Sequence, residues 1–205
     1  NVKYPLATSS WDHAEYDALN RVIASNQFSM GPEVRAFEEQ FARQFGSKYA
    51  VMVNSGSSAN LLALSSLTSP AHGERALKPG DEVITPPITF IATQATAALF
   101  GAKIVFVDVQ SDTANINPDA VEASITPRTK AIVAVDYAGH PADLDELRII
   151  ADKHKLYLIE DAAHSIGSTY RGRPVGSIAD ITTFSFFPTK NLTTAEGGAV
   201  ASIHP

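Results

Sequence analysis

Cysteine is absent from the 205-residue sequence, which excludes a disulfide framework and metal sites built from thiolates. We expect no bound metal. Long apolar runs are also missing, because no stretch approaches the roughly 18 residues that a membrane-spanning helix needs, and we expect no membrane association. The opening residues, NVKYPLATSS, lack the basic and apolar segments of a signal peptide. The prediction is a cytoplasmic protein.

Positive charge is scarce. The 16 lysines and arginines are outnumbered by 22 acidic residues, for a net charge of −6, which argues against a nucleic-acid-binding face. Small anions could still bind through backbone donors. The sequence contains neither the Gly-Lys-Ser/Thr ending of a Walker loop nor the GxGxxG fingerprint of a nicotinamide dehydrogenase, so both of those classes are disfavoured.

What is present is an alternation of strand-like and helix-like segments. Apolar runs predict strands at 49–53, 82–85, 103–109, 131–135, 156–160, 181–186 and 198–203. Several are continuously apolar, as in strands covered on both faces. The alternation predicts an α/β fold with three layers, α/β/α, around a mainly parallel seven-stranded sheet. Only a loop with no helical crossover joins the last two strands, so we expect the last strand to be antiparallel.

Helix signals lie between the strands. Pro32 opens one helix with Val34, Phe37 and Phe41 on one face and Gly46 past its end. Asn117-Pro118 opens a second helix, and residues 143–154 form a third. The segment SPAHGERALKP, 69–79, is expected to be an exposed loop.

In open parallel sheets, ligands bind at the carboxyl ends of the strands. NSGSSAN, 54–60, follows a strand there, and its glycine, serines and free helix-start N–H groups suit a phosphate, although a serine-rich helix cap is an equal alternative. EDAAHS, 160–165, follows another strand. Asp161 could face a positively charged ring nitrogen and His164 a ring substituent, or the two could be a helix cap and a surface residue.

Two further loops complete the set. Phe90 opens a helical stretch where its ring could stack on a flat ligand, or it could belong to the core. Ser185 ends a strand, and Lys190 follows on the next loop. A phosphate socket, a carboxylate for a ring nitrogen, a stacking aromatic and a lysine are together what pyridoxal 5′-phosphate requires.

The sequence resembles the DegT/DnrJ/EryC1/StrS family of pyridoxal-phosphate-dependent nucleotide-sugar aminotransferases, which have the aspartate aminotransferase fold (fold type I). The resemblance covers about residues 26–203. It rests on GPEVRAFEEQFA, NSGSSAN, PGDEVITPPITFIAT, FVDV, GHPADLDEL, EDAAHSIGSTYRG and FSFFPTKNLTTAEGGAV, which occur in the family's order.

The resemblance implies a role for each position. Lys190 would form the Schiff base and move the proton, and Asp161 would keep the pyridine nitrogen protonated. His164 would lie near the ring oxygen and Phe90 against the ring face. The phosphate would be held by Gly56, Ser57, Ser58 and Ser185. The implied reaction transfers an amino group from L-glutamate to a nucleotide-linked keto-deoxy-sugar, in a homodimer.

Other interpretations stay open. The stretch NSGSSANLLALSSLTSP is similar to that of sugar 3-dehydratases in the same family, but those enzymes replace the lysine with histidine, and this sequence keeps Lys190. A non-catalytic cofactor-binding fragment is a third interpretation. Family members are about twice as long. Residues 1–205 would therefore be the cofactor-binding large domain, with a helical segment at about 1–45 and without the small C-terminal domain.

Overall fold

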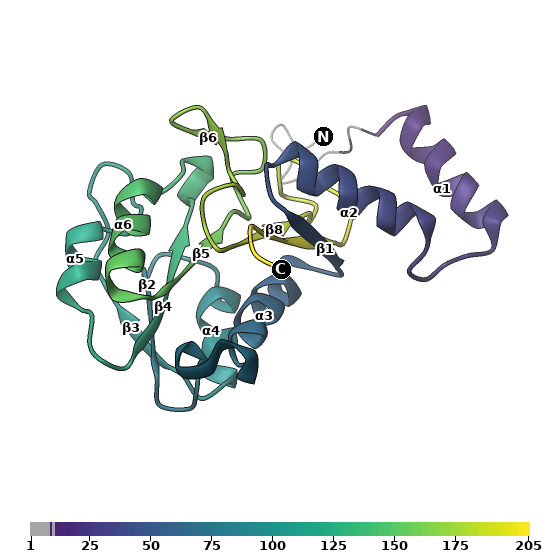
Figure 1. The fold of residues 1–205 in the computed structure, drawn as a ribbon. Helices are drawn as coiled ribbons and strands as arrows, with labels where there is room; N and C mark the ends of the chain where they lie inside the picture. Colours follow the sequence, from purple (N-terminus) through teal and green to yellow (C-terminus); the bar gives the residue numbers. More distant parts are fainter. Residues whose placement is uncertain (1–8, 10) are drawn as a thin grey trace.

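The computed structural model describes residue 9 and residues 11–205 (Figure 1). A seven-stranded sheet forms its centre, with the strand order β1-β9-β8-β5-β4-β2-β3. These strands are β1 (Tyr49–Val53), β2 (Glu82–Thr85), β3 (Lys103–Phe106), β4 (Thr129–Val135), β5 (Tyr157–Asp161), β8 (Ile181–Ser185) and β9 (Gly198–Ser202). β9 lies between β1 and β8 and is antiparallel to both, whereas the other pairings are parallel. The predicted fold is confirmed, including the direction of the last strand.

Helices cover both faces of the sheet. The α-helices of the described residues are α1 (His13–Ser25), which does not contact the sheet, and α2 (Pro32–Gln44), α3 (Gly56–Leu67), α4 (Ile91–Leu99), α5 (Pro118–Ala123) and α6 (Leu144–His154). Leu64 of α3 and Ala97 of α4 pack with Ile159 on one face. Leu147 of α6 packs with Leu158 on the opposite face. Because neighbouring residues of β5 point to opposite faces, a strand that is apolar at both positions is held between two helical layers.

α2 joins the second of these layers through aromatic packing. The ring of Phe41 lies 4.9 Å from that of Phe184 in β8 and 5.2 Å from that of Phe37 one turn earlier. Pro32 occupies the first turn of α2, and Gly46 follows its end with φ of 68°. Asn117 caps α5 by accepting the N–H of Asp119. The sequence predicted each of these helix ends.

Three local features differ from the predictions. Residues 69–79 are not simply an exposed loop, because Pro70–Arg75 forms the 3-10 helix η1 and the following Leu77 is buried in the core with Leu67. A second, two-stranded sheet, β6 (Thr169–Tyr170) and β7 (Arg173–Pro174), was not predicted, since each strand is only two residues long. Also, β3 ends at Phe106, three residues earlier than expected.

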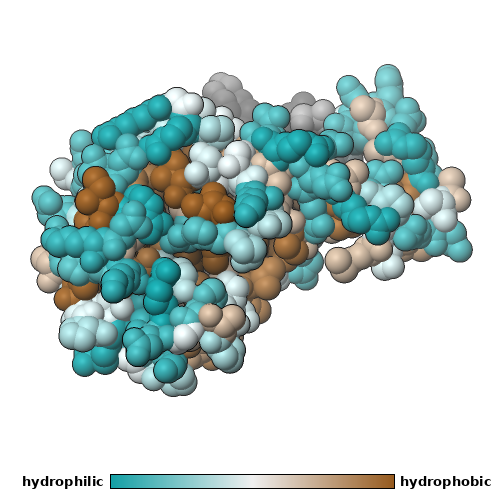
Figure 2. Space-filling view, in the orientation of Figure 1, coloured by the Kyte–Doolittle hydropathy of each residue, from teal (hydrophilic) through white to brown (hydrophobic). Residues whose placement is uncertain are grey.

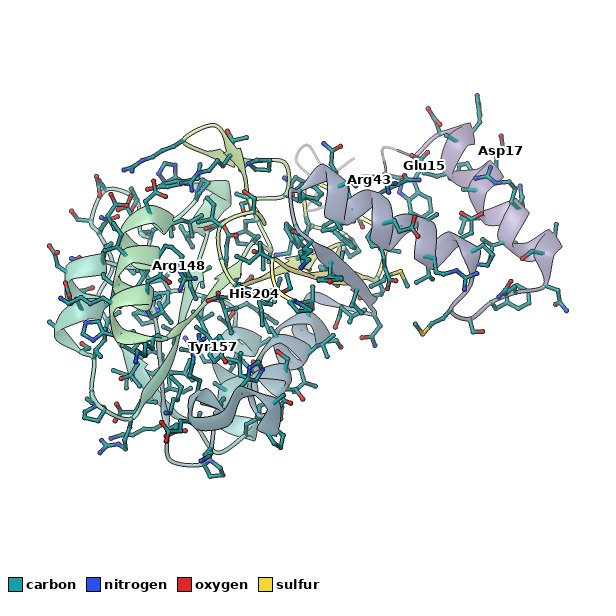
Figure 3. All side chains as sticks on the ribbon, viewed as in Figure 1. Glu15, Asp17, Arg43, Arg148, Tyr157 and His204 are labelled. Atoms are coloured by element: carbon teal, nitrogen blue, oxygen red, sulfur yellow. The ribbon has the colours of Figure 1, made fainter. Side chains whose placement is uncertain are left out.

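The amino ends of the central strands carry a polar cluster that fixes β8 and β9. Asp180, just before β8, accepts hydrogen bonds from Arg148 of α6 at 2.9 Å and from the backbone N–H of Leu158 at 2.8 Å. The His204 ring lies 2.8 Å from the same carboxylate. Arg148, His204 and Tyr157 all lie near this end of the sheet in Figure 3. No described helix is long and apolar enough to cross a membrane.

α1 stands apart from the layers. It lies beyond α2, away from the sheet, and none of its residues is buried (Figure 1). Polar side chains cover most of the visible face of the molecule, with apolar groups exposed between them (Figure 2). The two helices α1 and α2 fall inside the predicted N-terminal helical segment of about 1–45, of which residues 1–8 and 10 lie outside the described residues.

Candidate active site

A cavity of about 670 Å³ opens at the carboxyl ends of the parallel strands. Its walls are the loops that follow β1, β2, β4, β5 and β8, so five separate segments contribute side chains. This is where ligands bind in open α/β sheets, and the volume falls within the range of small-molecule sites.

The structure brings together nearly all the residues that the sequence singled out. Those lining the cavity are Gly56, Ser57, Phe90, Asp161, His164, Ser185 and Lys190. Ser58 is not among the lining residues, because it faces the N-cap of α3. The Ser55 hydroxyl accepts the Ser58 backbone N–H at 3.1 Å and donates to the Ser58 hydroxyl at the same distance.

The start of α3 forms a close-fitting socket against β8. A Cβ atom on Gly56 would lie 2.6 Å from the Cβ of Ser185, which is too short for a contact between two non-bonded carbon atoms. Glycine at this position therefore allows the helix start to approach the strand. Within the described residues, no acceptor takes the backbone N–H of Gly56 or Ser57. Free N–H groups and the helix dipole suit an anion such as a phosphate.

Asp161 ends β5 with its carboxylate at the base of the cavity, where the residue is 5% exposed. Its Oδ2 accepts hydrogen bonds from Asn60 Nδ2 at 2.9 Å and Thr93 Oγ1 at 2.7 Å, and its Oδ1 accepts the N–H of Ala163 at 3.2 Å. All three donors are neutral. A buried carboxylate without a cationic partner in the described chain fits a positively charged ligand group, such as a protonated ring nitrogen.

Lys190 is half-buried on the loop between β8 and β9. Its backbone N–H donates to the Phe187 carbonyl, and Asn191 fastens the loop to the carbonyl of Ile166 at 3.0 Å. Burial lowers the pKa of the Lys190 ammonium below its usual range, although the negative charge of Asp161 acts in the opposite direction. A lysine with a lowered pKa is more often present as the free amine, which is the form that attacks a carbonyl carbon.

His164 and Phe90 lie at the rim of the cavity. Partial burial lowers the pKa of His164, and the positive charge of Lys190 lowers it further, so the neutral imidazole is favoured. Phe90 precedes the first residue of α4 and is 71% exposed, which excludes the alternative that its ring belongs to the core. An exposed aromatic ring at a cavity rim is suited to stacking on a flat ligand.

Sequence reasoning missed other residues of the site. Asn60 and Thr93 hold Asp161, and Asp136, Tyr137 and Glu196 line the cavity. Asn60 lies one helical turn after Gly56, and Thr93 lies one turn after Phe90. That spacing was the available signal, since side chains on the first turns of these two helices can face the end of the same strand.

Comparisons with known proteins identify the relatives of this chain. The model of the DegT/DnrJ/EryC1/StrS aminotransferase family matches residues 9–205. The chain belongs to this family. Curated relatives of the family include a dTDP-4-dehydro-2,6-dideoxy-D-glucose 3-dehydratase from Saccharopolyspora spinosa, which is 48% identical over 92% of this chain and 41% of its own length. A spore coat polysaccharide biosynthesis protein from Bacillus subtilis is 44% identical over 92% of this chain and 46% of its own length.

Solved structures of the DegT/DnrJ/EryC1/StrS family have the same fold. An aminotransferase from Psychrobacter cryohalolentis superposes with a TM-score of 0.87 and 43% identity, covering 96% of this chain and 49% of that one. An E. coli GDP-4-keto-6-deoxy-D-mannose-3-dehydratase, solved with hydrated pyridoxal phosphate (PLP), superposes with a TM-score of 0.91 and 40% identity. The match covers 98% of this chain and 51% of that one. The chain thus spans about half the length of the relatives that it matches. Those relatives include both aminotransferases and dehydratases.

Proposed function

We propose that the chain is the cofactor-binding part of a pyridoxal-phosphate-dependent aminotransferase. It would transfer an amino group from L-glutamate to the keto carbon of a nucleotide-linked keto-deoxy-sugar. The observation that carries the proposal is that the Lys190 amine and the Asp161 carboxylate line one cavity, together with a socket of free N–H groups at the start of α3.

The residues that line the cavity suit pyridoxal phosphate in their chemistry as well as in their position. The close approach of Gly56 to Ser185 forms an anion cradle that a Cβ would fill, and the Gly56 and Ser57 N–H groups would hold the phosphate. Asp161 would hold a proton on the ring nitrogen, and the exposed ring of Phe90 would cover one ring face. Lys190 would hold the aldehyde carbon through Nζ. His164, favoured as neutral, can exchange a hydrogen bond with a ring substituent.

When bound, pyridoxal phosphate supplies an electron-withdrawing ring that stabilises negative charge on a substrate carbon. The chain's own contribution is to move protons and exclude water. The Lys190 Nζ, kept partly uncharged by burial, would accept a proton from the substrate and return it at a neighbouring atom. The apolar rim of Ile88, Phe90 and Phe187 limits access of water to that atom.

A sugar 3-dehydratase is the second candidate, because relatives with that name are 48% and 40% identical to this chain. The residue at position 190 distinguishes the two activities. The dehydratases of the family carry histidine at this position, whereas the lysine favours amino transfer.

We also propose that the protein acts as a homodimer. Family likeness supports this, and so do large apolar side chains left exposed on α1 and β1. Ile23 is 63% exposed, and Val51 and Met52 are 43% and 44% exposed. Large apolar side chains that are exposed to solvent can form part of a protein interface.

The decisive experiment is borohydride reduction of the protein after incubation with pyridoxal phosphate, followed by peptide mass spectrometry. We expect a cofactor-sized adduct on Lys190, its loss in Lys190→Ala, and its retention in the control Lys78→Ala, an exposed lysine outside the cavity. An unmodified Lys190 on folded protein would reject the proposal. Amino transfer should fall by about 10³-fold or more in Lys190→Ala, as for loss of a nucleophile that also moves protons.

Nitrogen-15-labelled L-glutamate separates the candidate reactions. Label in the sugar product identifies amino transfer. Loss of the 3-hydroxyl without label in the product identifies dehydration. A cofactor absorption band that L-glutamate does not change identifies a passive cofactor-binding chain.

A further inference from the structure

Two neutral side chains converge on a single oxygen of Asp161. Asn60 Nδ2 and Thr93 Oγ1 donate to Oδ2 at 2.9 and 2.7 Å. Asn60 is 7% exposed and Thr93 2% exposed, so both bonds are shielded from water. They come from different helices, α3 and α4, and each helix therefore fixes the carboxylate from its own side.

Each donor is itself oriented by a further hydroxyl. Thr183 Oγ1 donates to Asn60 Oδ1 at 2.8 Å, which leaves the Asn60 amide hydrogens to face Asp161. The Thr93 hydroxyl donates its only proton to Asp161. The Thr89 hydroxyl, 2.9 Å away, must therefore be the donor to Thr93. Hydrogen bonds linked in series polarise and strengthen one another in a shielded environment.

The two carboxylate oxygens of Asp161 have different hydrogen-bond partners. Oδ2 is occupied by the two side-chain donors, whereas Oδ1 accepts a single, longer bond of 3.2 Å from Ala163 and retains capacity for a ligand. Donors aimed at a carboxylate stabilise its charged form relative to the carboxylic acid. When a carboxylate shares a proton with a ring nitrogen, those donors therefore favour the proton on the nitrogen.

We propose that Asn60 and Thr93 are positioning residues that orient Asp161 through its Oδ2, and so favour the proton on the ring nitrogen of the bound cofactor. The inference rests on the proposed function, because it requires pyridoxal phosphate in the cavity. Neither residue touches the reacting atoms. Both act through Asp161.

The test is nitrogen-15 NMR of protein loaded with pyridoxal phosphate labelled at the ring nitrogen. In the unmodified protein we expect the resonance of a protonated ring nitrogen. In Thr93→Val, which removes the hydroxyl and keeps the shape, the resonance should move toward the unprotonated position. The cofactor dissociation constant should rise about tenfold, the lower range for a hydrogen bond to a charged group. Asn60→Leu should act in the same direction.

Two further variants make the result specific. Thr93→Ser restores the hydroxyl and should restore the resonance. Thr96→Val removes a buried hydroxyl of the same helix that bonds only to the Ala92 carbonyl, so it should leave the resonance unchanged. Variants Thr93→Val and Asn60→Leu that bind cofactor with the unmodified resonance would overturn the inference. Absence of cofactor on Lys190 in the unmodified protein would instead reject the proposed function.

Discussion

At the scale of single residues, two glycines decide how closely the segments around the cavity approach. Gly56 brings the start of α3 against Ser185, and Gly198 brings the start of β9 against the backbone of Ser55. A Cβ on Gly198 would lie 2.6 Å from the carbonyl carbon and oxygen of Ser55 and 2.8 Å from the carbonyl oxygen of Phe184. Backbone cannot move aside as a flexible side chain can, so the contact constrains the N-cap of the proposed phosphate socket.

Gly198→Ala should therefore damage stability and ligand binding together. We expect a loss of about 1–3 kcal/mol in the free energy of unfolding, the usual cost of overpacking, and weaker binding of pyridoxal phosphate because Ser55 is displaced. Urea unfolding and cofactor titration measure the two effects. Gly31→Ala is the matched control, because its added Cβ would meet only the movable end of the Gln27 side chain. Equal cofactor affinity in both variants would contradict the expected link between Gly198 and the socket.

At the scale of elements, two buried acids lie at the neighbouring strands β4 and β5: Asp136 directly follows β4, and Glu160 lies within β5. Asp136 and Glu160 are both fully buried, and the negative charge of Asp136 disfavours ionisation of Glu160. Asp136 also accepts the Ser165 hydroxyl, and Glu160 accepts the Thr182 hydroxyl. Burial raises the pKa of Asp136 to about 6, and burial beside Asp136 raises the pKa of Glu160 well above its usual range. A proton on Glu160 would relieve the cost of burying a second negative charge near Asp136.

The pair should make stability fall as the pH rises. The folded chain holds protons that the unfolded chain, with ordinary carboxyl pKa values near 4, has already released. The free energy of unfolding contributed by the pair is therefore greatest at acid pH and is lost as the pH rises from about 4 through 6 and beyond. Glu160→Gln removes one of the two titrating protons and leaves that of Asp136, so it should reduce this decline. Between pH 5 and pH 8 the unmodified protein should lose about 1–3 kcal/mol more free energy of unfolding than the variant.

Urea unfolding at those two pH values measures the difference. Glu39→Gln, a substitution on the exposed surface of α2, should keep the unmodified pH dependence. A parallel pH dependence for Glu160→Gln and the unmodified protein would show that Glu160 releases no proton in this range.

The elements also show what sequence alone could predict. Apolar runs, only some of them continuous, located all seven strands of the main sheet, and the lack of a helical crossover after Ser185 predicted the direction of β9. The sequence also placed Asp161 and Lys190 on loops at the same edge of the sheet, and both line one cavity. The contact between Asp136 and Glu160 could not be predicted, because it depends on how β4 and β5 align. The bonds of Asn60 and Thr93 to Asp161 depend on the rotation of two helices about their axes, which spacing along the chain does not determine.

At the scale of the whole molecule, α1 differs from the other long helices because it buries no residue. It has a complete capping box at Asp12 and Glu15, which favours the helix locally, but it gains no stability from the core. α2, of equal length, buries Phe41 and Ala42. The exposed apolar residues of α1 are available to a second copy of the chain in the proposed homodimer.

Hydrogen exchange at several protein concentrations tests this view. In the monomer, α1 amides should exchange at least about 100-fold faster than α2 amides, since opening α1 exposes little apolar surface. Protection of α1 should then rise with concentration as dimers form, whereas protection in α2 should change little. Protection of α1 equal to that of α2 in samples that sediment as monomers would contradict the expectation.

The position of β9 between β1 and β8 has a consequence for synthesis on the ribosome. β1 is made early, yet its only partner in the sheet is the last strand of the described chain. The nascent β1 must therefore wait, with its backbone unpaired, until nearly all of these residues have emerged. The loop bearing Lys190 is anchored at its far end by the same late strand, so Lys190 is fixed in place only after β9 has paired with β8.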